Sequence, residues 1–278
     1  ISLSEIVCDT EYLEGEKFVM TSATVRGDYG AGLQAIEKED YSLSYSLSEN
    51  DGYAAELTLP MLDVRQALQQ EVTVYIRATY NADPSLTATA EARVTVYDEA
   101  QYNIMNTYLP YDEANVEGMF GDKFPTFLPA NGVYKYEAER AVLGGIATNH
   151  GNYVGDLRHD NEKGDATVTF TFDSAADENV TVLLVMSLAI NPSFVPAGGD
   201  GAYFVYSELP GNKVTVNGVD VVTDGMVKDT NSWTTYAESA VAEITVKPGA
   251  NTILLTFAAD ATNLDYIKLV PTKTDAAA

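Results

Sequence analysis

The sequence predicts an all-β protein with two β-sandwich domains, and three observations support that prediction. Apolar and polar residues alternate in short runs such as residues 72–78, Val-Thr-Val-Tyr-Ile-Arg-Ala, and a repeat of two residues is typical of strands. Turn-forming residues separate the runs, among them Asn50-Asp51-Gly52 and Asn217-Gly218. A length of 278 residues with 46% hydrophobic residues is enough for two packed domains.

The charge balance restricts the possible partners. The chain has 16 basic and 41 acidic residues, which gives a net charge of −25. Such a surface repels phosphate backbones and anionic lipids, so we expect no nucleic-acid partner and no membrane insertion. Cys8 is the one cysteine, so no internal disulfide can form, and its apolar neighbours predict a buried strand residue. No signal peptide is visible and the first residue is not Met, so we expect a fragment of a longer protein.

Residues 1–97 are predicted to form the first domain, an immunoglobulin-like sandwich that acts as a spacer. Regular short strands over about 100 residues are typical of such sandwiches. One short segment, residues 61–70, has helical character. The expected strands are residues 2–7, 18–26, 41–47, 53–59, 72–80 and 88–97.

Residues 98–132 are predicted to be an ordered connector. Residues 98–108 can form a short helix, and the prolines that follow prevent its extension. The segment is rich in aromatic residues, whereas a flexible linker would be polar and rich in Gly and Ser. We therefore expect it to pack against a domain and to fix the two domains relative to each other.

Residues 133–271 are predicted to form the second sandwich, followed by a disordered or truncated tail at residues 272–278. Residues 166–172 alternate cleanly between Thr and apolar residues, and the apolar run 180–190 is typical of a strand buried on both sides. Two hairpins are expected, one around Asn217-Gly218 and one joining residues 240–246 to 252–258 through Pro248-Gly249. The final strand is residues 264–270.

Three carboxylates in this domain form a candidate metal site. Glu137 and Glu139 alternate with apolar residues, so on a strand both would point to one face. Asp265 has the same setting near the end of the domain. If the first and last strands pair, the three carboxylates converge, and oxygen ligands of this kind suit a structural calcium ion. The alternative is three solvated carboxylates on a sheet surface.

Six short motifs follow one another in the second predicted domain: Tyr136-Glu137-Ala138-Glu139, Gly151-Asn152-Tyr153-Val154-Gly155, Val214-Thr215-Val216-Asn217-Gly218, Ser232-Trp233, Pro248-Gly249-Ala250-Asn251-Thr252-Ile253 and Asn263-Leu264-Asp265-Tyr266-Ile267. Together they resemble carbohydrate-binding modules of families 6 and 35. Their order and spacing over half the chain carry the resemblance. It implies a calcium-bearing jelly-roll β-sandwich that binds sugars and does no chemistry. More loosely, residues 10–16 resemble the opening of bacterial immunoglobulin-like repeats.

The same resemblance implies the residues of a sugar site. The residues that match Tyr153 and Trp233 sandwich the sugar in the family, and the residue that matches Asn263 bonds its hydroxyl groups. The polar neighbours of Trp233 place it in a loop, and Tyr236 is an alternative aromatic platform. An insert at residues 191–211 departs from the family and could line or cover the pocket.

An enzymatic reading has less support. Asp156, Asp160, Glu162 and Asp165 could supply a carboxylate pair for glycoside hydrolysis or hold a second calcium ion, but an acidic chain produces such clusters by chance. His150 and His159 are the only histidines, which excludes a three-His zinc site. We therefore expect no enzymatic activity in this chain.

The leading hypothesis is a monomeric glycan-binding module, stabilised by calcium, with an immunoglobulin-like spacer. It would be part of a larger secreted or cell-surface bacterial protein, such as a glycoside hydrolase or an adhesin, whose other domains are its partners. The alternative is a structural pair of domains that orients its neighbours and binds no sugar.

Overall fold

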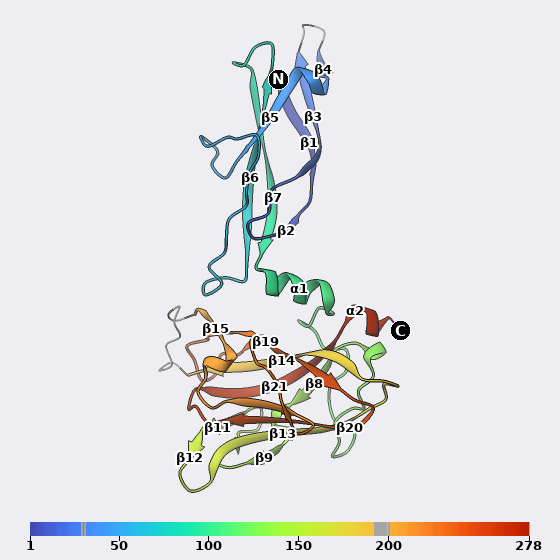
Figure 1. Ribbon diagram of the computed structural model, residues 1–278, viewed down its shortest axis with the longest axis vertical. Helices are drawn as coiled ribbons and strands as arrows, with labels where there is room; N and C mark the ends of the chain where they lie inside the picture. The colour runs from blue at the N-terminus through green and yellow to red at the C-terminus, as the bar shows by residue number, and fades with distance from the viewer. Residues whose placement is uncertain (29, 31, 192–198, 200, 278) are drawn as a thin grey trace. The chain divides into compact units, whose positions relative to one another are not determined.

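A computed structural model describes residues 1–278 except 29, 31, 192–198, 200 and 278. The chain divides into two compact units, Ile1–Asn103 and Ile104–Ala278. Both are built mainly from strands (Figure 1), so the prediction of an all-β chain is confirmed. Part of the predicted insert, residues 192–198 and 200, lies outside the described residues.

The first unit has two sheets. One has the strand order β1-β3-β4 and the other β2-β7-β6-β5, with β2 parallel to β7 (Figure 1). Its core includes Phe18, Leu59, Val74 and Ile76. Cys8 ends β1 and is half-buried. The immunoglobulin-like assignment stays a prediction. The elements are β1 (Ser2–Cys8), β2 (Glu11–Leu13), β3 (Met20–Asp28), β4 (Leu33–Ala35), the 3-10 helix Lys38–Asp40, β5 (Tyr41–Ser46), β6 (Gln69–Tyr80) and β7 (Thr87–Tyr97).

Two predictions for the first unit are wrong. Residues 53–59 form isolated bridges instead of a continuous strand: Ala54 pairs with Tyr45, and Thr58 pairs with Lys17. Residues 61–70 form no helix. The amides of Gln66 and Ala67 both donate to the carbonyl of Asp63, which closes a single turn, and β6 begins at Gln69.

The helix predicted at the start of the connector is present as α1 (Glu99–Thr107). Asp98 precedes it, and its carboxylate accepts hydrogen bonds from the amides of Ala100 and Gln101, as expected of an N-cap residue. The boundary between the units falls inside this helix, after Asn103, and the rest of the connector belongs to the second unit. The expectation that the connector fixes the two domains relative to each other stays a prediction.

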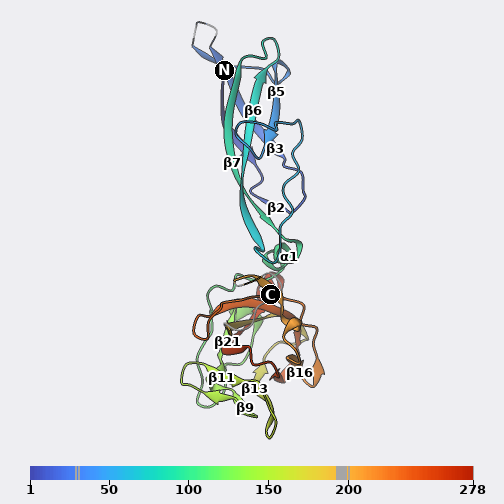
Figure 2. The same cartoon turned by 90° about the vertical axis from the view of Figure 1, so that its left-hand side faces the viewer.

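The second unit is a sandwich of two six-stranded sheets. One has the order β10-β11-β21-β14-β19 with β8 on β21, and the other β12-β13-β20-β16-β17 with β9 on β13. Figures 1 and 2 show β21 in one layer and β9 and β13 in the other. Side chains from both sheets fill one core, for example Leu184, Phe170 and Phe257. The strands are β8 (Tyr134–Glu137), β9 (Val142–Gly144), β10 (Thr148–Asn149), β11 (Val154–Leu157), β12 (His159–Asp160), β13 (Gly164–Ser174), β14 (Val180–Ile190), β15 (Tyr203–Val205), β16 (Lys213–Val216), β17 (Val219–Asp220), β18 (Met226–Lys228), β19 (Ala237–Val246), β20 (Gly249–Phe257) and β21 (Thr262–Pro271).

The first and last strands of this unit pair, which was the condition for the predicted metal site. β8 runs antiparallel to β21, and Glu137 faces Tyr266 across the ladder. The prediction that Glu139 shares the strand is wrong, because β8 ends at Glu137 and Glu139 lies in the 3-10 helix Ala138–Arg140. A strand and a 3-10 helix aim side chains differently, so simple alternation does not describe this motif.

One predicted hairpin is confirmed and the other is wrong. β16 and β17 pair around Asn217 and Gly218, whose φ angles of 50° and 84° suit a two-residue hairpin turn. β19 and β20 do not pair, since β19 lies beside β14 and β20 lies between β13 and β16. The turn at Gly249 therefore carries the chain from one sheet to the other. The buried side chain of Asn251 holds that turn through bonds to the backbone of Lys247 and Gly249.

Several aromatic rings in the rest of the connector pack into the second unit. The Phe127 ring is fully buried and lies 5.1 Å from the Tyr134 ring, and the Phe124 ring lies 4.7 Å from the Tyr136 ring, measured between centroids. Tyr108 packs on the outer face of the first sheet with Leu183 and other apolar residues. These rings are removed from water as part of the domain.

The C-terminal segment is ordered, contrary to the predicted tail. β21 continues to Pro271, and α2 (Lys273–Ala276) follows it. Thr272 caps this short helix by accepting a hydrogen bond from the Asp275 amide at 3.0 Å. The 3-10 helices Pro129–Asn131 and Tyr206–Glu208 complete the unit.

Candidate functional site

The predicted sugar-site residues meet at one end of the second sandwich. The β10–β11 hairpin carries Tyr153 at its turn, and β11 pairs with the first half of β21 through Val154 and Leu264. This pairing brings Tyr153 beside Asn263. A bulge after Val154 interrupts the ladder, and bulges of this kind re-aim side chains at the edge of a sheet.

The loop with Trp233 is fastened to the same end. The Ser232 amide donates to the Ile190 carbonyl at 2.8 Å, and the Ile190 amide donates to Thr230 Oγ1 at 2.8 Å. Asn263 Nδ2 donates to the Trp233 carbonyl at 2.9 Å. Asn263 itself is 8% exposed, whereas the Trp233 side chain remains 37% exposed. Buried polar contacts thus hold a partly exposed indole in place.

His150 belongs to this site, and sequence reasoning did not include it. Its imidazole stacks on the Tyr153 ring with a centroid distance of 4.8 Å and an interplanar angle of 12°. Its Nε2 lies 3.8 Å from Asp156 Oδ2. One face of Tyr153 is therefore covered by a ring from its own hairpin.

Gly155 explains how His150 and Asn263 come so close. A Cβ atom at Gly155 would lie 3.0 Å from the His150 ring and 3.1 Å from Asn263 Oδ1, so a side chain there would displace both. The Tyr153-Val154-Gly155 motif was the available signal, because a glycine inside a strand often marks a close approach.

Tyr236, the alternative platform, is less accessible than Trp233. Its ring lies 6.2 Å from that of Tyr153 and is tilted by 51°. Its hydroxyl is buried without a hydrogen-bond partner among the described residues. Burial raises the pKa of Tyr236, and the nearby Asp265 carboxylate raises it further. Tyr236 thus lies between the aromatic site and the carboxylate group.

The three predicted metal ligands lie close enough to influence one another electrostatically. Burial, followed by the carboxylates of Glu137 and Glu139, raises the pKa of Asp265 to about 6, although Lys135 acts in the opposite direction. Like charges that converge in a partly buried place make ionisation costly. Oε2 of Glu139 is buried and has no hydrogen-bond partner among the described residues.

Other contacts of these carboxylates limit the fit to a metal. Lys135 Nζ lies 2.8 Å from Glu137 Oε1, so this carboxylate has a cationic partner within the chain. Across the described residues, no three His, Cys, Asp or Glu side chains lie close enough together to hold a metal ion. The unpartnered Glu139 oxygen and the raised pKa of Asp265 suit a cation, whereas a common coordination sphere would require the Glu137 side chain to leave Lys135.

The second acidic cluster forms a solvated turn. Asp160 Oδ1 accepts hydrogen bonds from the amides of Glu162 and Lys163, both at 2.9 Å, and Asp165 Oδ1 lies 2.7 Å from His159 Nδ1. His159, Glu162 and Asp165 are exposed. Asp156 lies apart from this turn, beside His150.

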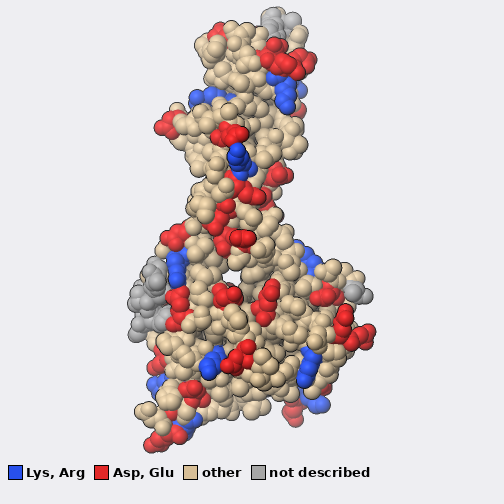
Figure 3. Space-filling view, viewed as in Figure 1, with Lys and Arg blue, Asp and Glu red and all other residues tan. Residues whose placement is uncertain are grey.

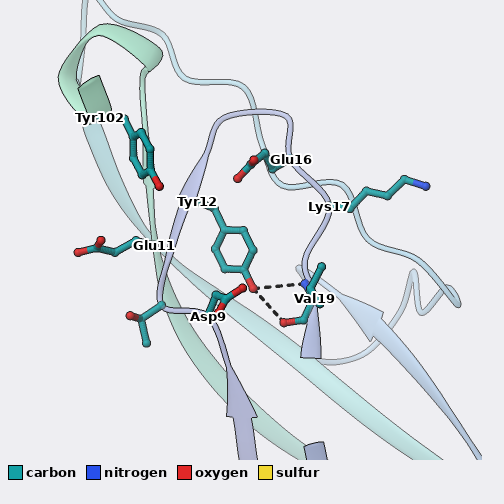
Figure 4. A pocket seen from close by; sticks show the side chains of 8 residues that line it. Asp9, Glu11, Tyr12, Glu16, Lys17, Val19 and Tyr102 are labelled. Carbon is teal, nitrogen blue, oxygen red and sulfur yellow. Dashed lines mark hydrogen bonds between the residues drawn. The ribbon is translucent and has the colours of Figure 1, made fainter. Parts of the chain in front are cut away.

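The first unit has a polar surface hollow of about 530 Å³. Figure 4 shows the Tyr12 ring inside it, with the hydroxyl bonded to the backbone of Val19 and with Asp9 and Glu16 nearby. Burial raises the pKa of Tyr12. Tyr12 is buried here, whereas Asp9, Glu11 and Glu16 are exposed, so the hollow offers an acidic surface. The hollow is lined by Asp9, Thr10, Glu11, Tyr12, Glu16, Lys17, Val19 and Tyr102.

The surface agrees with the acidic composition. On the face drawn in Figure 3, acidic side chains are spread over both units and basic ones lie singly among them. Within the described residues, no helix is long and apolar enough to cross a membrane.

The chain matches no protein-family model and no curated protein. Among solved structures, it is similar to the family 35 carbohydrate-binding module from Paenibacillus barcinonensis, at 18% identity and a TM-score of 0.33, over 49% of this chain and 96% of that one. The C-terminal family 6 module of a laminarinase from Zobellia galactanivorans is 15% identical with a TM-score of 0.33, over 49% of this chain and 98% of that one.

A larger protein is similar over the same share of the chain. The isomalto-dextranase of Arthrobacter globiformis T6, solved with panose, is 21% identical with a TM-score of 0.37 over 52% of this chain. This chain spans 24% of that enzyme. At these identities and TM-scores the similarities do not decide the function, which therefore has to be inferred from the site.

Proposed function

We propose that the second unit is a non-catalytic glycan-binding module and that Trp233, Tyr153 and Asn263 form its site. The observation that carries this proposal is a partly exposed indole held beside a buried Asn263 through the 2.9 Å bond to its carbonyl. Flat aromatic faces cover the C–H groups of pyranose rings, and polar groups at the rim bind hydroxyls. An exposed aromatic next to Asn263 favours a binding role over a purely structural one.

The contacts support weak binding. Covering the exposed part of one indole contributes at most a few kcal/mol at about 25 cal/mol per Å², and each hydrogen bond to Asn263 adds roughly 1 kcal/mol. Association entropy cancels much of this gain. We expect dissociation constants on the order of 10 μM to 1 mM, so retention on a polymer would depend on several modules acting together.

Trp233→Ala tests the proposal. We expect the variant to lose glycan binding and to keep its thermal unfolding midpoint, because the loop is held by backbone atoms and by Ser232, Thr230 and Asn263. A glycan array followed by titration calorimetry measures binding. Phe120→Ala is the matched control, since Phe120 is an aromatic residue with 77% exposure and is not part of the site.

Two results would contradict the proposal. If Trp233→Ala lowers the unfolding midpoint strongly, the ring is a packing residue. If the unaltered chain binds no glycan on the array, the alternative of a structural pair of domains is favoured.

We also infer that Glu137, Glu139 and Asp265 hold a structural calcium ion. The raised pKa of Asp265 and the unpartnered, buried Glu139 oxygen support a cation at this place. Calcium accepts several carboxylate and carbonyl oxygens in flexible geometry, so a rotation of Glu137 away from Lys135 would complete the set. The ion would stabilise the fold and take no part in sugar binding.

The wider context remains a proposal too. A soluble acidic surface and a glycan-binding role fit a secreted or cell-surface protein in which this chain accompanies other domains. The exposed acidic turn at Asp160 offers no enclosed carboxylate pair, which supports a role without catalysis for this part of the protein.

A further inference from the structure

We propose that Asp229 is a positioning residue of the glycan site, whose buried carboxylate holds the loop that presents Trp233. This inference rests on the proposed function and adds a residue to that site. Asp229 acts on the indole indirectly, through the backbone of the loop between them.

The carboxylate of Asp229 is buried and bonded to backbone on two sides. The residue is 1% exposed. Its Oδ1 accepts a hydrogen bond from the Asn231 amide at 2.9 Å, and its Oδ2 accepts one from the Gly201 amide at 3.2 Å. Removing a carboxylate from water is costly, and hydrogen bonds to a charged acceptor, which are stronger than neutral ones, offset part of that cost. One buried side chain thus links two segments that are 28 residues apart.

Asp229 lies where a strand ladder ends and the Trp233 loop begins. β15 pairs antiparallel with β18, and the Asp229 amide continues that ladder by donating to the Ala202 carbonyl at 2.9 Å. The same ribbon is fastened to β19, because the amide of Gly225, just before β18, donates to the Val241 carbonyl at 3.1 Å. The backbone of Asp229 is therefore anchored to the sheet, and its side chain extends that anchor into the loop.

The first turn of the loop depends on this carboxylate. Asn231 adopts a φ of +46°, a left-handed conformation that residues other than glycine adopt only with local support. The bond from its amide to Asp229 Oδ1 gives that support. Without it, the chain that leads to Trp233 gains freedom, and the loop would have to be ordered when a sugar binds, which lowers affinity.

Trp233 can report on its own loop, because it is the one tryptophan of the chain. Asp229→Ala removes both acceptor oxygens. We expect the emission of Trp233 to shift to longer wavelength and acrylamide to quench it more strongly, because a looser loop exposes the indole. Glycan affinity, measured by titration calorimetry, should fall by about tenfold, since the loop must be ordered on binding. Isomaltotriose, laminaritriose, mannotriose and the strongest binder on the glycan array serve as probes.

Asp229→Asn makes the same test with a side chain of equal size. Its one amide oxygen can accept from Asn231 or from Gly201, but its NH₂ group cannot accept from either, so we expect intermediate quenching and affinity. Asp160→Ala is the matched control. The Asp160 carboxylate also accepts hydrogen bonds from two backbone amides, in the turn after β12, and its loss should leave both readouts unchanged.

Unchanged quenching in both Asp229 variants would overturn the inference, and so would stronger quenching with unchanged glycan affinity. If Asp229→Ala does not fold, Asp229→Asn decides by the same two readouts. Failure of both variants to fold would make Asp229 a general packing residue and would also overturn the inference. If no probe binds the unaltered chain, the proposed function fails, whereas the quenching comparison still decides whether Asp229 holds the loop.

Discussion

Asp265 is a carboxyl group whose ionisation the fold opposes. Burial and two neighbouring carboxylates raise its pKa to about 6, whereas an aspartate in an unfolded chain titrates near 3.9. The metal-free folded state therefore binds more protons than the unfolded state between about pH 4 and 6, and this group destabilises the fold as the pH rises through that window.

The prediction is a relative loss of stability on going from pH 4 to pH 6.5 in the presence of a chelator. Asp265→Asn should remove this component, which we put at about 1 kcal/mol after allowing for solvent screening at a half-buried group. Urea unfolding of both forms across the pH range measures the difference. Identical pH profiles for the two forms would contradict it.

At the same scale, the sequence indicated some site residues and not others. Tyr153, Trp233 and Asn263 could be named from motifs, and the structure places them at one end of the sandwich. His150 could not, because its stacking depends on the turn of the β10–β11 hairpin and on the missing side chain of Gly155. Contacts of this kind depend on how closely one backbone segment approaches another, and residue type alone does not predict that distance.

Among the structural elements, the connector that leads into the second unit should contribute strongly to its stability. Phe127 is fully buried against Tyr134 and Phe172. Phe127→Ala should therefore destabilise the unit by about 3–5 kcal/mol, the usual cost of removing a buried phenylalanine. Urea unfolding measures the loss. Phe120→Ala, at an exposed position of the same segment, should stay within about 0.5 kcal/mol of the unaltered chain.

The strands also show where sequence patterns stop being informative. Both ends of β14 could be predicted from the sequence, because its eleven mostly apolar residues are bounded by polar residues. The link from β19 to β20 was misread as a hairpin, since a tight turn between two alternating runs suits both a hairpin and a crossing between sheets. The buried Asn251 that holds this crossing is a polar residue whose partners are backbone atoms, and such a role is not visible in a pattern of polarity.

For the whole molecule, the calcium proposal predicts that the two units respond differently to a chelator. An ion that binds only the folded second unit stabilises it by mass action. Thermal unfolding followed by calorimetry should show a transition that moves to lower temperature with chelator and returns with excess calcium. A chain ending at Asn103 should show no such shift. Equal curves with chelator and with calcium for the full chain would contradict the proposal.

The position of β21 has a consequence for biosynthesis. This strand pairs with β8, β11 and β14, and it is the last strand of its unit. A ribosome that has delivered everything up to residue 261 has therefore made a sheet that still lacks its central strand. The first unit, whose last strand ends at Tyr97, can fold long before that point. Until the ten residues of β21 emerge, the second unit exposes unpaired strand edges, which are prone to aggregation. Its yield should thus depend on how quickly β21 emerges and on chaperones that cover those edges.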